Sequence, residues 1–308
     1  MPRILFVKTS SLGDVVHHCP AVSDAARALE GAQIDWVLEE AFAGVARLHR
    51  AVRRVIPLAL RRWRRAPWRA SVWSEIAELR RELRAERYDA VIDTQGLLKS
   101  ALVSSRAFGT KHGMDRASAR EPIAARFYDV AHAVPRALHA VERNRRLTAA
   151  ALGYSLDAAP EYGLKAAPGA GNGAYAVLLT MTSRADKLWP EERWIELGRA
   201  LALPVVLPWG SAAERERAER VARGIGQAAG VPQRMAIDAL AELLSNAKAV
   251  AGLDTGLTHL AAALGVPTVG IYCASDPALT GLYGAPRARN VGAPGKPPQV
   301  FEVLKSFP

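Results

Sequence analysis

Short apolar runs and amphipathic runs alternate along almost the whole chain. The short runs are rich in Val and Ile, which is typical of parallel strands buried on both faces. They lie at residues 4–8, 34–38, 54–56, 90–93, 174–179, 204–208, 248–253 and 268–272. Between them, apolar residues recur at helical spacing, most clearly at residues 74–85, 191–201, 213–223 and 240–246. This alternation predicts an α/β protein with doubly wound parallel sheets.

One stretch near the middle of the chain breaks the alternation. Residues 158–172 are rich in Ala, Pro and Gly and show no apolar period. The chain has 308 residues, which is enough for about two domains of ordinary size. We therefore expect one domain at residues 1–160, a linker at 161–172 and a second domain at 173–308.

The junction at residues 250–260 predicts an anion site. The expected strand stops at Asp254, Thr255 and Gly256 turn the chain, and apolar residues at helical spacing follow. A turn of this kind presents free backbone N–H groups and the positive end of a helix dipole, which suits a diphosphate. His259 lies about one helical turn further on and adds a hydrogen-bonding side chain.

A second junction lies at residues 3–14, where a strand is followed by small hydrogen-bonding residues. Gly13 permits a close approach of the backbone to a ligand. Asp14 suits either an N-terminal helix cap or a general base held at a cleft. The glycine pattern is neither a dinucleotide fingerprint nor a P-loop. Two such junctions, one in each half, predict a cleft between two α/β domains.

Two further strand ends carry polar residues. After residues 174–179 come Thr182, Ser183 and Lys187, which suit a phosphate clamp or a capping turn with a solvated lysine. After residues 204–208 comes Glu214, whose carboxylate either complements a helix dipole or accepts hydrogen bonds from a ribose.

The charge balance points to an acidic partner. The chain has 41 Lys and Arg against 30 Asp and Glu, so its formal net charge is +11. This surplus suits a nucleic acid, an anionic membrane surface or a phosphorylated substrate. Arginines are densest at residues 61–65, around Trp63, and Arg120 is a candidate for the same surface. The cluster is either a solvated face or a binding site for anionic groups.

Several classes of protein are not indicated. The sequence shows no known nucleic-acid-binding module and no metal-ligand spacing. No run approaches the roughly 20 apolar residues that span a bilayer. Two cysteines in apolar surroundings predict a reduced, cytosolic protein, and the expected strand at the N-terminus leaves no room for a signal peptide. Any membrane contact is then expected to be peripheral and cytoplasmic.

Segments spread along the chain resemble the lipopolysaccharide heptosyltransferases. They are Lys8-Thr-Ser-Ser-Leu-Gly-Asp14, Arg61-Arg-Trp63, Ile92-Asp-Thr-Gln-Gly-Leu-Leu-Lys-Ser100, Lys111-His-Gly113, Ala119-Arg-Glu-Pro122, Leu207-Pro-Trp-Gly210 and Asp254-Thr-Gly-Leu-Thr-His259. The last segment alone indicates only the wider family. The Arg-Arg-Trp and Ala-Arg-Glu-Pro segments favour the enzymes that add the first heptose over those that add the second.

The resemblance implies an inverting glycosyltransferase of the GT-B type, with two Rossmann-like domains facing a cleft. The implied reaction moves L-glycero-D-manno-heptose from ADP-L-glycero-β-D-manno-heptose to a Kdo sugar of Kdo2-lipid A. No metal, cofactor or nucleic acid is implied. The enzyme would work at the cytoplasmic face of the inner membrane, in peripheral contact with anionic lipid.

The resemblance also implies roles for individual residues. Asp14 would be the general base, and Lys187 would stabilise the departing diphosphate. The implied donor-binding residues are Thr182, Ser183, Lys187, Glu214 (ribose), Met235 (adenine), Asp254, Thr255, Gly256 and His259. The implied acceptor-binding residues are Ser11, Gly13, Arg61, Arg62, Arg64, Gln95 and Arg120.

Other interpretations stay open on the residues alone. A heptosyltransferase of the second type would share most of the motifs. A nucleotide-sugar isomerase or epimerase is also a two-domain α/β protein, but it would need no lipid acceptor. A basic nucleotide- or RNA-binding protein would bind nucleic acid with a steep salt dependence and would not turn over ADP-heptose.

Overall fold

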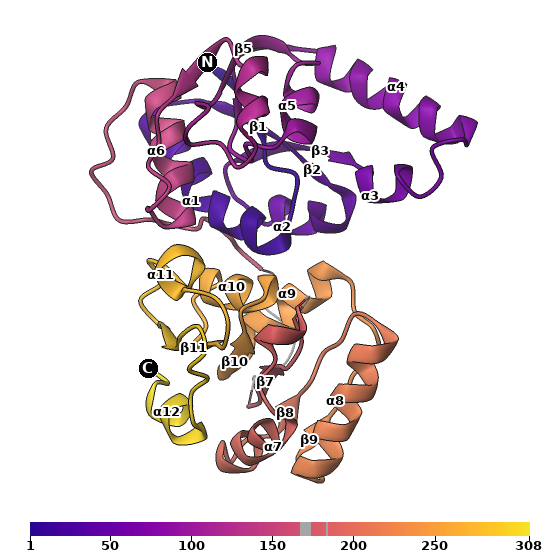
Figure 1. Cartoon of the computed structure of the whole chain (residues 1–308), viewed down its shortest axis with the longest axis vertical. Coiled ribbons are helices and arrows are strands. Elements are labelled where there is room, and N and C mark those ends of the chain that lie inside the picture. Colours follow the sequence, from indigo (N-terminus) through magenta and orange to yellow (C-terminus); the bar gives the residue numbers. More distant parts are fainter. Residues whose placement is uncertain (167–173, 183) are drawn as a thin grey trace. The chain divides into compact units, whose positions relative to one another are not determined.

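The computed structural model describes residues 1–166, 174–182 and 184–308, and the chain forms two compact units, Met1–Leu164 and Lys165–Pro308 (Figure 1). The second half of the predicted linker, residues 167–172, lies outside the described residues. Its first residues belong to the first unit, because the Arg50 backbone N–H donates to the Gly163 carbonyl oxygen at 3.0 Å. Leu164 also forms an antiparallel bridge with His49.

The first unit is a parallel sheet with helices on both faces. The strands run in the order β3-β2-β1-β4-β5-β6. They are β1 (Arg3–Val7), β2 (Gln33–Glu39), β3 (Val52–Leu58), β4 (Arg87–Asp93), β5 (Phe108–Met114) and β6 (Val130–His132). The helices are α1 (Leu12–Ala28), α2 (Ala43–Arg47), α3 (Leu60–Trp63), α4 (Ala70–Arg84), α5 (Leu98–Ser104) and α6 (Ala140–Leu152).

The alternation of side chains along β1 explains the two layers. Leu5 and Val7 belong to a core cluster with residues of α4 and α5, such as Leu79 and Val103. Phe6 points to the other face, where its ring makes an edge contact with His18 of α1. Successive strand residues face opposite sides of a sheet, so β1, which is apolar and buried from Ile4 to Val7, requires helices on both faces.

The second unit repeats the same plan. Its strands run in the order β12-β11-β10-β7-β8-β9. They are β7 (Ala176–Leu179), β8 (Val205–Val206), β9 (Ala229–Gly230), β10 (Ala249–Leu253), β11 (Thr268–Tyr272) and β12 (Ala288–Gly292). The helices are α7 (Glu191–Ala200), α8 (Ala212–Ile225), α9 (Ile237–Ser245), α10 (Gly256–Ala263), α11 (Pro277–Thr280) and α12 (Val300–Lys305).

Both sheets have the strand order of a Rossmann fold. Counted from β1 in the first unit and from β7 in the second, the order across each sheet is 3-2-1-4-5-6. The order in which strands are added to the sheet therefore reverses between β1 and β4, and again between β7 and β10. Ligands of open α/β sheets bind at the carboxyl ends of the strands at such reversals. We therefore expect the functional residues to lie at the carboxyl ends of these four strands.

The predicted α/β class is confirmed, and each predicted strand and helix overlaps an observed one. Several boundaries were wrong; for example, the strand predicted at residues 54–56 spans Val52–Leu58, and the helix predicted at residues 240–246 spans Ile237–Ser245. The strand predicted at residues 204–208 pairs only over Val205–Val206, and the helix predicted from residue 74 begins at Ala70. Four strands were missed, namely β5, β6, β9 and β12.

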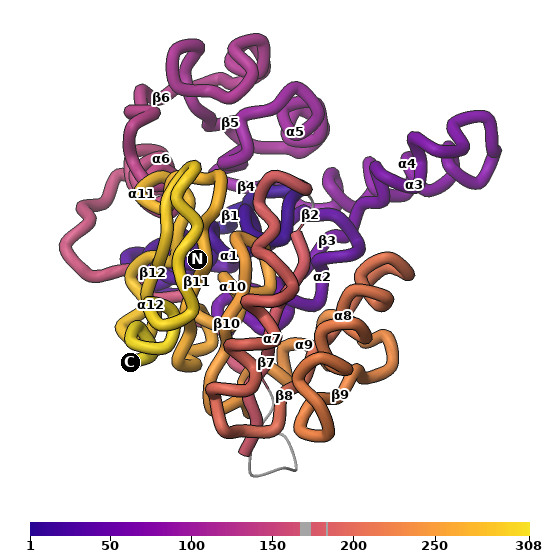
Figure 2. The backbone as a smooth tube through the Cα atoms, turned by 60° about the horizontal axis from the view of Figure 1, so that its bottom comes forward, coloured from indigo at the N-terminus to yellow at the C-terminus, as the bar shows by residue number. Residues whose placement is uncertain are grey.

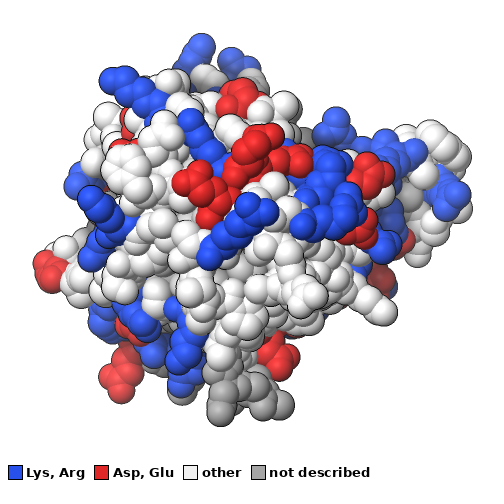
Figure 3. Space-filling view, turned by 90° about the horizontal axis from the view of Figure 1, so that it is seen from below, with Lys and Arg blue, Asp and Glu red and all other residues white. Residues whose placement is uncertain are grey.

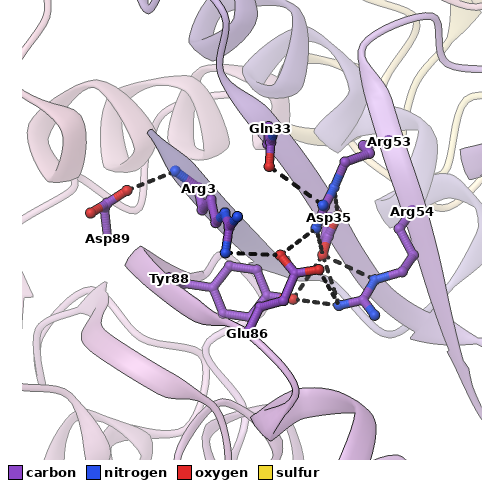
Figure 4. A network of polar contacts seen from close by, with 8 residues as sticks. All are labelled: Arg3, Gln33, Asp35, Arg53, Arg54, Glu86, Tyr88 and Asp89. Atoms are coloured by element: carbon purple, nitrogen blue, oxygen red, sulfur yellow. Dashed lines mark hydrogen bonds and ion pairs between the residues drawn. The ribbon is translucent and has the colours of Figure 1, made fainter. Parts of the chain in front are cut away.

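A polar network holds three strands of the first unit together away from these strand ends (Figure 4). The fully buried Asp35 of β2 accepts hydrogen bonds from Arg53 and Arg54 of β3, at 2.8 to 3.1 Å, and from the Tyr88 hydroxyl of β4 at 2.8 Å. Glu86 accepts a further bond from Arg53 at 2.8 Å. A buried carboxylate is tolerated only when its charge and lone pairs are satisfied, and here they are.

Candidate functional site

The loop between β1 and α1 presents Asp14 at the first strand reversal. Ser11 is the N-cap of α1, and Asp14 is its third residue. The Ser11 backbone N–H donates to Asp14 Oδ2 at 2.8 Å, and Arg120 Nη1 lies 3.6 Å from the same oxygen. The Asp14 side chain is 26% exposed, and both of these contacts engage Oδ2. Asp14 thus takes part in the helix cap and still has Oδ1 to accept a proton.

Residues after β4 hold this loop in place. Gln95 Oε1 accepts hydrogen bonds from the backbone N–H groups of Thr9 and Ser10, at 3.1 and 3.2 Å. Lys99 Nζ donates to Ser10 Oγ at 2.8 Å. The loops after β1 and β4 are therefore joined directly. This agrees with the strand order, in which β1 and β4 are neighbours.

Lys8 provides a buried positive charge beneath the loop. Its ammonium donates to the Thr94 carbonyl oxygen at 2.9 Å and to Asn144 Oδ1 at 3.3 Å. Burial lowers the pKa of Lys8 to about 8, and the negative charge of Asp14 acts in the opposite direction. Lys8 and Asp14 are thus electrostatically coupled.

The arginine cluster divides into two kinds of residue. Arg62 is held by ion pairs with Glu40 and Glu75, at 3.1 and 2.8 Å. Arg61 and Arg64 instead contribute, with Asp14, to the electrostatic surroundings of Lys99, whose pKa is lowered chiefly by burial. Of the predicted arginines, Arg61, Arg64 and Arg120 are brought near the Asp14 loop, whereas Arg62 braces the fold.

In the second unit, Asp254 is the centre of a hydrogen-bonded group at the end of β10. Its Oδ2 accepts from Lys187 Nζ at 2.5 Å and from Ser275 Oγ at 2.6 Å, and its Oδ1 lies 3.4 Å from His259 Nε2. Thr182 Oγ1 donates to the Asp254 carbonyl oxygen at 3.2 Å. The four side chains that converge on Asp254 come from the ends of three different strands.

Hydrogen bonds keep Asp254 ionised, and the start of α10 lies beside it. Burial alone would raise the pKa of Asp254, but hydrogen bonds from His259, Lys187 and Ser275 outweigh burial and hold this pKa well below its usual value. An ionised Asp254 keeps Lys187 in place. Nearby, Thr255 caps α10 and Gly256 begins it, so the first N–H groups of the helix point out of its start.

The turn into α10 is shaped by close packing. Thr258 Oγ1 donates to the Leu253 carbonyl oxygen at 2.7 Å. A Cβ added at Gly252 would lie only 2.2 Å from that hydroxyl oxygen. Glycine in β10 therefore lets the helix start close against the strand, and this sets the position of the Asp254 group.

Two of the remaining predicted donor residues, Glu214 and Met235, follow other strands, β8 and β9. Glu214 is in the first turn of α8, and its Oε2 accepts from the Gly210 backbone N–H at 2.7 Å. Met235 is partly buried in the loop before α9. Ser183 lies outside the described residues. Within the part of the chain that the structure describes, no hydrogen bond or ion pair joins Glu214 or Met235 to Asp254.

Sequence reasoning missed two contributors, Ser275 and Lys99. Ser275 follows β11, the strand next to β10. Its position just after an apolar run could have predicted that it lies at a strand end. Lys99 lies within a motif that was recognised but to which no role was given. Among the described residues, no group of three or more His, Cys, Asp or Glu side chains suits a metal ion. None of the described helices is long and apolar enough to cross a membrane.

Comparison with known proteins places the chain in a family. Residues 76–303 match the model of glycosyltransferase family 9 (heptosyltransferase), so the chain belongs to that family. It is an enzyme of the heptosyltransferase class.

Within the family, the similarity to one type is high. The chain is 48% identical over 292 residues to lipopolysaccharide heptosyltransferase 1 of Escherichia coli K12, covering 92% of this chain and 91% of that protein. The structure of E. coli heptosyltransferase WaaC with ADP superposes with a TM-score of 0.91 at 43% identity, covering 98% of each chain. The same enzyme with ADP-2-deoxy-2-fluoro heptose gives a TM-score of 0.86 over 99% and 96% of the two chains.

Proposed function

We propose that this heptosyltransferase moves L-glycero-D-manno-heptose from ADP-L-glycero-β-D-manno-heptose to a Kdo sugar of Kdo2-lipid A. The observation that carries the proposal is Asp14, a partly exposed carboxylate at the β1/β4 reversal with Oδ1 left to act. The high similarity to heptosyltransferase 1 supports the choice of the first heptose over the second. Family membership also favours group transfer over an isomerase or a nucleic-acid-binding protein.

The proposed chemistry is a single displacement. Asp14 Oδ1 takes the proton from the acceptor hydroxyl, and the hydroxyl oxygen attacks the anomeric carbon of the heptose. The bond between that carbon and the phosphate oxygen breaks, and ADP leaves with the electron pair. One displacement inverts the anomeric centre. Asp14 ends the step protonated and passes the proton to water.

The leaving group needs positive partners, and the second unit offers them. Lys187 and the Thr182 hydroxyl lie around Asp254, beside the start of α10 at Thr255 and Gly256. Donors fixed before the reaction stabilise developing charge at little reorganisation cost. In this proposal Asp254 holds Lys187 and His259 in position, and His259 contacts the donor. Ser183 is assigned to the same group from the sequence alone.

The ends of the two substrates are assigned to further residues. Glu214 keeps one carboxylate oxygen beyond its bond to Gly210, and we assign that oxygen to a ribose hydroxyl. Met235 is assigned to the adenine. On the acceptor side, Ser11, Gly13 and Gln95 shape the loop around Asp14, and Arg61, Arg64 and Arg120 receive anionic groups.

The deciding experiment is a transfer assay. The protein is incubated with ADP-heptose and deacylated Kdo2-lipid A, and ADP release and product mass are followed. Equimolar ADP release and a mass gain of one heptose, also in the presence of EDTA, are the expected results. Hydrolysis of ADP-heptose without a mass gain would refute the assigned acceptor. Dependence on added magnesium would refute the metal-free mechanism. The enzyme would work as a cytoplasmic, peripheral protein at the inner membrane.

A further inference from the structure

Two tryptophans stand on the surface of the first unit, close together in the chain. Trp68 lies in the loop between α3 and α4 and is 77% exposed, and Trp73 lies in the first turn of α4 and is 63% exposed. Trp73 Nε1 donates to the Pro67 carbonyl oxygen at 3.0 Å. This bond holds Trp73 against the loop that carries Trp68. In Figure 2, α3 and α4 project away from the sheet of their unit.

Exposed arginines lie near the two tryptophans in the chain. Arg65 and Arg69 are exposed in the same loop as Trp68, and Arg80 is exposed on α4. Within the described residues none of the three forms an ion pair, in contrast to Arg62. Figure 3 shows Lys and Arg side chains gathered over the projecting part of the molecule. Guanidinium groups without protein partners are available for external anions.

The side chains of α4 are segregated by chemistry. Val72, Leu79 and Leu83 are buried against the sheet. Trp73, Arg80 and Arg84 each follow one of these residues, so they form a second stripe along one flank of the helix. The acidic residues occupy the other flank, where they line a hollow together with Glu40 and Trp63; they are Glu75, Glu78 and Glu82.

The basic stripe ends at another exposed aromatic ring. The Arg84 guanidinium lies 5.2 Å above the ring of Phe108, which is 47% exposed at the start of β5. From Trp73 to Arg84 the helix rises about 16 Å. The α4 surface, defined here as Arg65, Trp68, Arg69, Trp73, Arg80 and Arg84, thus combines aromatic rings with clustered cations and excludes the acidic flank.

We propose that the α4 surface docks on an anionic phospholipid bilayer. Indole rings prefer the headgroup region, where the ring is shielded from water and the N–H meets polar groups. Arginines beside them pair with lipid phosphates, and each adds favourable attraction to an anionic leaflet. A projecting edge suits a planar partner, whereas a peptide needs a groove. This inference rests on the proposed function, because the proposed lipid acceptor would lie in a bilayer.

The binding test contains neither donor nor acceptor, so it is independent of activity. Sedimentation with vesicles of phosphatidylcholine and phosphatidylglycerol measures the partition coefficient, with pure phosphatidylcholine vesicles for comparison. Lipids brominated in the acyl chain quench only tryptophans that enter the interface. We expect binding to the anionic vesicles and quenching of the wild-type fluorescence.

The variants separate this surface from a general affinity for lipid. Trp68→Ser with Trp73→Ser should lower the partition coefficient at least about ten-fold and remove the quenching. The matched control is Phe301→Ser in α12, because Phe301 is also exposed, at 58%, and lies beneath a cation, Lys305. This control should bind vesicles as the wild type does.

The activity arm uses the same variants. The double tryptophan variant should keep its kcat/KM for the deacylated acceptor, but its KM for the acceptor embedded in anionic vesicles should rise at least about five-fold. Unchanged vesicle binding in the double variant, or an equal loss in the Phe301 control, would overturn the proposal. So would tighter binding to an oligoribonucleotide than to anionic vesicles at equal ionic strength, since that outcome would assign the surface to nucleic acid.

Discussion

Two carboxylates of this protein combine an observed structural contact with a proposed chemical role. Asp14 was expected to be either a helix cap or a base, and its two oxygens make these roles compatible. Oδ2 takes the Ser11 N–H and lies near Arg120, while Oδ1 is left for a substrate. Glu214 shows the same division, with one oxygen bound to the Gly210 N–H. A carboxylate in the first helical turn is oriented by the cap, and that orientation is useful to a ligand.

Asp14→Asn tests the proposed base. The amide keeps the shape and an oxygen for the Ser11 N–H, but it cannot take up a proton at neutral pH. We expect kcat to fall on the order of 10²–10⁴-fold, with little change in the affinity for ADP-heptose. Steady-state kinetics and calorimetric titration of the donor measure the two quantities. A folded variant with near-normal kcat would exclude Asp14 as the base.

Lys187→Ala tests the diphosphate site. Loss of one charged hydrogen bond should weaken ADP binding by roughly 1.5–3 kcal/mol and slow turnover. Adenosine lacks the phosphates, so its affinity should stay the same. The matched control is Lys248→Ala, which removes an exposed lysine of the same unit. Equal losses for ADP and adenosine would place the role of Lys187 away from the phosphates.

Lys8 predicts a specific pH dependence of stability. Its folded pKa of about 8 lies below the ordinary value of about 10.4 in an unfolded chain. Between these values the unfolded state binds more protons, so the free energy of unfolding rises with pH. Relative to Lys8→Met, the wild type should therefore gain about 1–3 kcal/mol between pH 7.5 and pH 10. Urea titrations at both pH values measure this gain, and parallel curves for the two proteins would contradict it.

At the scale of elements, the segment from α3 to α4 carries several separate tasks. Arg62 and Trp63 both bind Glu75 of α4, at 2.8 and 2.6 Å, so these contacts tie the two helices together. Arg61 and Arg64 contribute to the surroundings of Lys99, close to the Asp14 loop. Arg65, Trp68 and Arg69 belong to the α4 surface. In the proposed assignment, one short basic run therefore contains residues that brace the fold, residues that bind the acceptor and residues that bind the membrane.

Arg61→Ala with Arg64→Ala should act on the acceptor alone. We expect the KM for Kdo2-lipid A to rise by about ten-fold or more, because two guanidinium partners of anionic groups are lost. The KM for ADP-heptose should change little. Arg62→Ala is the matched control. It should lower the melting temperature and leave the acceptor KM close to that of the wild type. Loss of donor affinity in the double variant would show that the cluster serves the other substrate.

For the whole molecule, the net charge of +11 is the most general property. This charge would give a long-range attraction toward the proposed acceptor, which carries negative charge and would lie among negative lipids. Paired arginines such as Arg62 contribute less to it than those without a carboxylate beside them. The attraction between exposed charges is screened over about 8 Å at physiological ionic strength.

The acceptor KM of the wild type should therefore rise with salt. Between low and physiological ionic strength we expect a several-fold increase for the acceptor, and a smaller one for the donor. Potassium chloride and potassium acetate are compared to separate screening from specific anion binding. An acceptor KM that ignores ionic strength would show that charge attraction does not guide the acceptor.

The local pattern of the sequence determined much of the fold. Strands such as β1 and β10 are continuous apolar runs, and the turn after Asp254 has its own residue chemistry, so neighbouring residues suffice to predict them. The missed strands lack these signals. β5 reads Phe-Gly-Thr-Lys-His-Gly-Met and is only partly buried, and β9 pairs over two residues. Such strands form because a neighbouring strand offers hydrogen bonds, which is a tertiary effect.

The composition of the site was decided by strand order. That Gln95 joins the loop at Asp14, and that Ser275 joins Asp254, follows from which strands lie side by side in each sheet. Arg62, unlike Arg61, forms ion pairs with Glu40 and Glu75, which lie in other elements of the chain. The sequence by itself therefore determined which residues stand at strand ends. Only the tertiary structure decided which of them meet, because those contacts join segments that no local pattern relates.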